Sequence, residues 1–147
     1  MPSSSCRLRI RSPTARAGAT RPATTSLDRD PWRKDVFQYV SRLVKFRTEA
    51  DALSVNDTEF LHVDFSDGKR VLVWRRGGPD HAPVIVVANF SDWGSASQTE
   101  PASEYRVPGW PDAPAGKSWR EVTLARPAPR AGREPLFPWE AKVYTWA

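Results

Sequence analysis

The chain has 147 residues, enough for one domain, and its 22 basic and 17 acidic side chains give a formal net charge of +5. The excess lies in residues 1–27, which hold five arginines and no acidic residue, so the remaining 17 basic and 17 acidic side chains cancel. A nucleic-acid-binding face would need basic side chains clustered on one element of the folded part, and this distribution gives no support to one.

The composition also argues against several classes of site. Cys6 is the only cysteine, so the sequence offers no internal disulfide and no cysteine-based metal site. His62 and His81 are too few and too far apart to suggest a metal pair, and we expect neither a metal nor a cofactor. No apolar run approaches the roughly 20 residues that span a bilayer. Residues 1–27 lack the apolar core of a secretory signal, which favours the cytoplasm over secretion.

Residues 1–27 form a basic tail rich in Ser, Thr, Ala, Arg and Pro. Such a segment cannot bury enough apolar surface to offset the entropy of ordering, so we expect it to be disordered. An organellar transit peptide has a similar composition, and a basic tail can also contact anionic polymers without specificity. These alternatives stay open.

Residues 28–55 carry the pattern of one amphipathic helix, predicted over residues 30–53. Asp30 supplies an N-cap acceptor, and proline follows at the first helical position. The apolar residues then recur at helical spacing on a wide face, formed by Val36, Tyr39, Val40, Leu43, Val44, Phe46 and Ala50. A helix this apolar needs a large partner, so we expect that its partner is absent from this sequence.

Residues 56–147 predict a mostly β domain, an antiparallel β-sandwich of about six to eight strands. The run PVIVVANF, residues 83–90, is short, apolar and β-branched, which is typical of a central strand buried on both faces. Asp67-Gly68 predicts a tight hairpin between strands at 58–65 and 69–76. Further strands are predicted at 104–107, 118–124 and 141–146, and residues 126–135 are expected to form a loop.

Three segments, taken in order, carry a resemblance to a known family. They are WRKDVFQYVSRLVKFRTEADAL at residues 32–53, VVANFS at residues 86–91 and FPWEAKVY at residues 137–144. Their order and spacing resemble the C-terminal end of a bacterial α-amylase-family glycoside hydrolase (family 13). The resemblance implies that the helix is the last helix of a (β/α)8 barrel, and that residues 56–147 are the all-β domain that follows it.

The sequence departs from the family at two points. The family leaves its last helix through a His-Pro-Ala-Leu-like segment, whereas this chain has Ala50-Asp51-Ala52-Leu53. The family's nucleophilic Asp, acid/base Glu and transition-state-stabilising Asp lie on barrel loops, and no carboxylate of this sequence matches their motifs. No catalytic residue is therefore assigned, and the chain as it stands is not expected to be an enzyme.

The polar residues of the β region have structural interpretations. Asp64 and Asp67 flank the predicted hairpin and favour its turn. His62 is expected to be a partly buried packing residue, and Glu134 and Glu140 are expected to be solvated.

Two loop tryptophans are the candidates for a binding site. Trp93 and Trp110 are expected to cover the ends of the sandwich, and they are also the candidates for stacking on sugar rings. The leading hypothesis is a non-catalytic C-terminal fragment whose partner is a catalytic barrel. The alternative is a free-standing module that binds an α-glucan through these two side chains.

Overall fold

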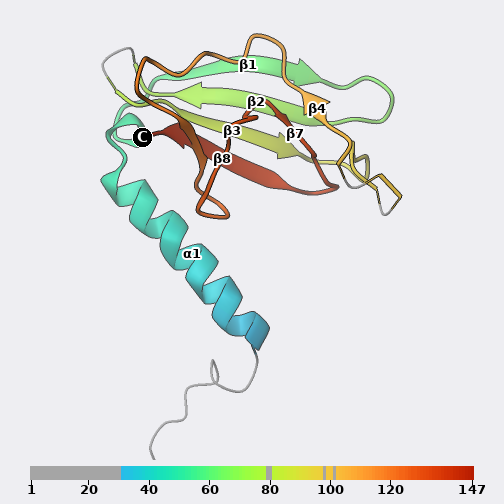
Figure 1. Ribbon diagram of the computed structural model, residues 1–147, viewed down its shortest axis with the longest axis horizontal. Helices are drawn as coiled ribbons and strands as arrows, with labels where there is room; N and C mark the ends of the chain where they lie inside the picture. Colours follow the sequence, from blue (N-terminus) through green and yellow to red (C-terminus); the bar gives the residue numbers. More distant parts are fainter. Residues whose placement is uncertain (1–30, 79–80, 98, 101) are drawn as a thin grey trace, which may run out of the picture.

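The computed structural model describes residues 31–78, 81–97, 99–100 and 102–147. It confirms a mostly β chain with one long helix, and all of its strand pairs are antiparallel. Figure 1 shows the helix running away from the sheet. The predicted tail and the N-cap at Asp30 lie outside the described residues.

Helix α1 covers Pro31–Glu49 and is followed by a short 3-10 helix, η2, at Asp51–Leu53. The prediction that one helix continues to residue 53 was wrong. Ala50 takes an extended conformation, with φ −84° and ψ 106°, and this breaks the α-helix after Glu49. The 3-10 turn brings Ala52 against the sheet, where only 1% of it is exposed.

Eight strands form two sheets, a six-stranded one in the order β1-β2-β3-β8-β5-β6 and a two-stranded one of β4 and β7. The strands are β1 (Thr58–Asp64), β2 (Val71–Arg76), β3 (Val84–Asn89), β4 (Tyr105–Arg106), β5 (Trp119–Glu121), β6 (Arg126–Pro127), β7 (Arg133–Glu134) and β8 (Ala141–Trp146). The two ladders support a sandwich-like arrangement in which the second layer is far smaller than the first.

The hairpin between β1 and β2 follows its sequence signal. Lys69 donates its backbone N–H to the Ser66 carbonyl at 2.8 Å, and the two residues between them, Asp67 and Gly68, both have positive φ. Two successive positive φ angles define the tight turn that Asp-Gly favours. Strand β3 is also as predicted, since five of its six residues are buried.

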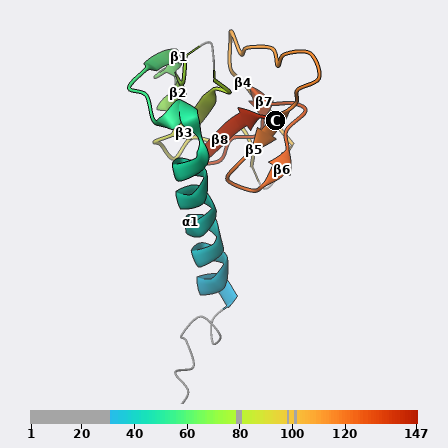
Figure 2. The ribbon, with the colours of Figure 1, turned by 90° about the vertical axis from the view of Figure 1, so that its left-hand side faces the viewer.

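The core lies on one face of the large sheet. Val73, Ile85 and Tyr144 from that face pack with Tyr105 of β4 and with Leu136, which follows β7. The β4–β7 ladder and its loops therefore cover this face, which is called the inner face below (Figures 1 and 2).

Residues 126–135 are not the plain loop that the sequence predicted. They contribute two two-residue strands: β6 pairs with β5 at the sheet edge, and β7 pairs with β4. A two-residue strand carries no alternating pattern, and a proline such as Pro127 is unfavourable in the middle of a sheet. Proline is tolerated because β6 is an edge strand.

Candidate functional site

Two carboxylates, Glu121 of β5 and Glu134 of β7, meet at one guanidinium. Arg126 donates to both Glu134 oxygens at 2.9 Å, and its Nη2 lies 2.5 Å from Glu121 Oε2. Tyr144 donates its hydroxyl to Glu134 at 2.6 Å, and Thr123 donates its hydroxyl to Glu121. Because paired carboxylates are the groups that cleave glycosidic bonds, this arrangement is the first to be tested as a reaction centre.

Both carboxylates are buried and ion-paired with Arg126, although Glu121 Oε2 accepts no hydrogen bond from the described residues. The side chain of Glu121 is 1% exposed and that of Glu134 is 9% exposed. Burial alone would raise the pKa of Glu134, but the hydrogen bonds from Arg126 and Tyr144 outweigh it and lower that pKa. The cavity beside Glu134 measures about 10 Å³, too small for a sugar ring. The pair therefore behaves as an ion network that ties β5, β6, β7 and β8 together.

The prediction that Glu134 is solvated was wrong for this reason. Glu140 is partly buried, and its carboxylate accepts the backbone N–H of Phe137 at 2.9 Å. Sequence reasoning also missed Glu121, Arg126 and Tyr144 as one group. These residues lie on three different short strands, so no spacing in the sequence indicates that their side chains meet.

A second polar chain links the hairpin to β4. Tyr105 donates its hydroxyl proton to Asp64 Oδ2 at 3.0 Å, and His62 Nε2 lies 3.0 Å from the same hydroxyl. Tyrosine has one proton to give, so His62 Nε2 carries the proton in this arrangement. Burial and the Asp64 carboxylate raise the pKa of Tyr105. His62 is partly buried, as expected, and Asp64 organises the turn while also holding Tyr105.

The two candidate stacking tryptophans both pack against other aromatic rings. The Trp93 ring meets Tyr105 edge-on at 5.5 Å, and the Lys69 ammonium lies 5.3 Å from its centroid. The Trp110 ring meets Trp119 at 5.3 Å and Tyr144 at 5.2 Å. These contacts fit side chains that close the end of the core. The most exposed indole is that of Trp139, at 65%.

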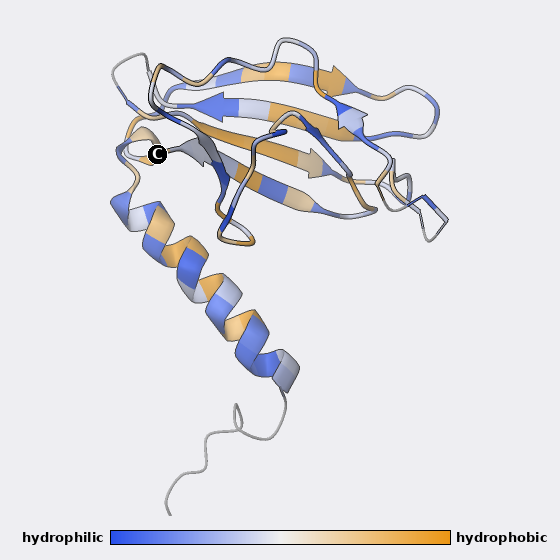
Figure 3. Ribbon diagram, in the orientation of Figure 1, coloured by the Kyte–Doolittle hydropathy of each residue, from blue (hydrophilic) through white to orange (hydrophobic). Residues whose placement is uncertain are grey.

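The outer face of the large sheet presents a continuous apolar row. Phe60, Trp74, Val86 and Val143 stand opposite one another across β1, β2, β3 and β8. Phe60 is 62% exposed, and the other three are half-buried. The inner face, by contrast, is covered by the β4–β7 layer. Figure 3 shows an apolar run along β3, and polar residues between the apolar ones along β1 and β8.

Helix α1 presents a second open apolar surface. None of its 19 residues is buried, and Val36, Val40 and Val44 are 52%, 49% and 58% exposed. These three valines are four residues apart and so form one stripe along the helix. Phe37 and Trp32 extend this stripe, with exposures of 57% and 61%.

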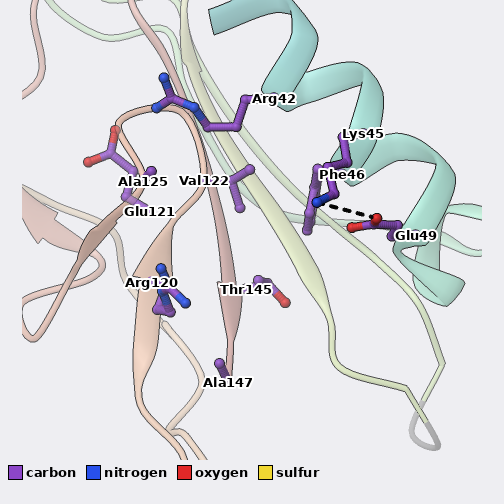
Figure 4. Close-up of a pocket in the computed structure, with 10 residues that line it drawn as sticks. All are labelled: Arg42, Lys45, Phe46, Glu49, Arg120, Glu121, Val122, Ala125, Thr145 and Ala147. Atoms are coloured by element: carbon purple, nitrogen blue, oxygen red, sulfur yellow. Dashed lines mark ion pairs between the residues drawn. The ribbon is translucent and has the colours of Figure 1, made fainter. Parts of the chain in front are cut away.

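The helix is held only loosely to the sheet. A cleft of about 240 Å³ separates Arg42, Phe46 and Glu49 on α1 from Arg120 and Thr145 on β5 and β8 (Figure 4). Among the described residues, the Arg42 guanidinium donates a hydrogen bond to the Thr123 carbonyl at 3.0 Å, which joins α1 to the segment after β5. The open helix stripe and the partly exposed row on the outer face of the sheet together form the candidate functional site, and we call it the apolar docking surface.

Comparisons with protein-family models, with curated proteins and with solved structures found no match. Within the described part of the chain, no cluster of three or more His, Cys, Asp or Glu side chains could hold a metal ion. No helix among the described residues is long and apolar enough to cross a bilayer.

Proposed function

We propose that residues 31–147 are the non-catalytic C-terminal portion of an α-amylase-type glycoside hydrolase. In this role helix α1 and the outer face of the sheet pack against the catalytic barrel and stabilise it. The proposal rests on the family resemblance of the three sequence segments, and on the apolar docking surface that this portion leaves open.

The observation that carries the proposal is a 19-residue helix with no buried residue. Most helical stability in proteins comes from packing of the apolar face against a partner rather than from the helix alone. Complete burial of one valine contributes about 1.5 to 3 kcal/mol, and the stripe on α1 leaves roughly half of this gain unrealised at each of three valines. A partner domain on this stripe would supply it.

The outer face of the sheet offers a second surface for the proposed contact with the barrel. Antiparallel sheets commonly have one packed face and one solvated face that is polar. Here the row from Phe60 to Val143 is apolar instead. Exposed apolar patches of this kind mark surfaces that contact another protein.

The native polypeptide tests this proposal. An antibody against the β1–β2 hairpin would recover the protein from its source cells for mass spectrometry and for an assay of maltooligosaccharide conversion. We expect peptides of a (β/α)8 barrel with the family's Asp, Glu and Asp motifs in the same polypeptide, together with conversion. Recovery of the 147-residue chain alone, without conversion, would refute the proposal.

A free-standing α-glucan-binding module is the second candidate, favoured by the open indole of Trp139. Its Nε1 is fixed by a hydrogen bond to Asp92 at 2.7 Å, which holds the ring in one orientation. Retention of the purified chain on amylose resin would test it, with Trp93→Ala, Trp110→Ala and Trp139→Ala variants. Binding that is lost in at least one variant supports this candidate, and absence of retention by the wild type rejects it.

A further inference from the structure

A hollow of about 440 Å³ lies beside the β4–β7 ladder, away from the apolar docking surface, and three arginines line it: Arg106, Arg130 and Arg133. Arg106 and Arg133 stand directly opposite each other in the ladder, and both are exposed. Like charges in this position destabilise a strand pair. Packing therefore gives no reason for the two arginines, whereas binding of an anion would.

Two of the three arginines of the hollow have no carboxylate partner among the described residues. Within the part of the chain that the structure describes, no ion pair joins Arg106 or Arg133 to a carboxylate. Arg130 is paired with Glu104. Asp112 is the one acidic side chain among the described lining residues. The guanidinium groups of Arg106 and Arg133, opposite partners in the β4–β7 ladder, are therefore exposed to solvent without a carboxylate partner.

The wall of the hollow is rigidly built. Gly132 lies flat on the Trp110 indole, and a Cβ at this position would stand 2.5 Å from Trp110 Cγ. The Gly132 carbonyl accepts the backbone N–H of Val107 at 2.8 Å, which holds β7 against β4. The Trp110 Nε1 is buried and has no acceptor among the described residues. Prolines at 108 and 129 limit movement of the rim.

We propose that this hollow binds the phosphate group of a small phosphate monoester through Arg106 and Arg133. The planar guanidinium fork matches phosphate oxygens in a bidentate way, and two forks facing each other can hold a dianion between them. The volume exceeds that of a bare phosphate and falls within the range of small-molecule sites. This inference does not depend on the proposed function.

Isothermal titration of the full chain tests it, with inorganic phosphate and glucose 6-phosphate as probes at constant ionic strength. We expect saturable binding of both probes, with the ester bound more tightly. The Arg106→Gln/Arg133→Gln variant should bind at least about tenfold more weakly. Its melting temperature should be unchanged or higher, because the variant removes a like-charge pair; a simple structural role for these residues would lower it.

Lys117→Gln/Arg120→Gln is the matched control, since it removes the same charge from exposed positions outside the hollow. We expect it to change affinity by less than about twofold. Absence of saturable binding by the wild type would overturn the proposal. An equal loss of affinity in the control would also overturn it, because binding would then follow net charge alone.

Discussion

At the scale of single residues, Arg126 allows two carboxylates to stay buried beside each other. Replacing it by methionine leaves Glu121 and Glu134 without their shared cation. We expect Arg126→Met to lower the free energy of unfolding at pH 7 by about 2–4 kcal/mol, a range that allows for the 39% exposure of the Arg126 side chain. Urea unfolding would measure this loss.

The same variant should acquire a specific pH dependence. Without the guanidinium, burial raises the pKa of Glu134 and only Tyr144 and Lys142, whose Nζ lies 4.0 Å away, oppose it. The folded variant then binds more protons than the unfolded chain and loses stability as the pH rises from about 4 to 8. Arg120→Met, at an exposed position, is the control and should behave as the wild type. If Arg126→Met loses the same free energy of unfolding at every pH, the ion-network interpretation is contradicted.

Asp64 should give the wild type the opposite pH dependence, a loss of stability as the pH falls. Hydrogen bonds, led by that from the Ser66 hydroxyl, lower the pKa of Asp64 from 3.8 to about 2. Its contribution to stability is therefore complete above the unfolded pKa and is lost as the pH falls from about 4 to 2. Asp64→Asn should cost about 1–2 kcal/mol at pH 7 and flatten this acid limb in urea titrations. Asp67→Asn is the control, because the Asp67 side chain is 86% exposed; equal acid limbs in wild type and Asp64→Asn would refute the assignment.

At the scale of elements, Gly77 joins η2 to the sheet. It has φ +99°, and a Cβ there would lie 2.6 Å from Ala52 Cβ. Gly116 has φ +77° with open space around it, so it isolates the backbone effect. We expect Gly77→Ala to cost about 2–4 kcal/mol, and Gly116→Ala about 1 kcal/mol, in thermal or urea unfolding. Similar losses in both would show that Ala52 does not lock the helix segment to the sheet.

The elements with strong local signals were the ones that the sequence predicted. The hairpin turn is determined by Asp67-Gly68 alone. Strands β3 and β8 are each determined by a short run of residues that favour strands. Strands β6 and β7 have only two residues each, and no periodicity can reveal them. The burial of Glu134 depends on Tyr144, ten residues away, which reaches it only once β7 and β8 are in place. The arginine hollow was missed because its residues become opposite partners only through the β4–β7 register.

At the scale of the whole molecule, the apolar docking surface should cause the isolated chain to associate. Val36→Lys/Val40→Lys places two charges on the stripe and should shift the chain toward monomer in light scattering. Gln38→Lys/Ser41→Lys adds the same charge elsewhere on α1 and is the matched control. If the control variant dissociates the chain equally, net charge rather than the stripe governs association.

The most direct test of the central claim is amide hydrogen exchange along α1. It would compare the isolated 147-residue chain with the native protein recovered from its source cells. If a catalytic barrel covers the helix stripe, residues 31–49 should exchange quickly in the isolated chain and at least about tenfold more slowly in the native protein, while β3 stays protected in both. Equally fast exchange of these residues in both samples would contradict the account.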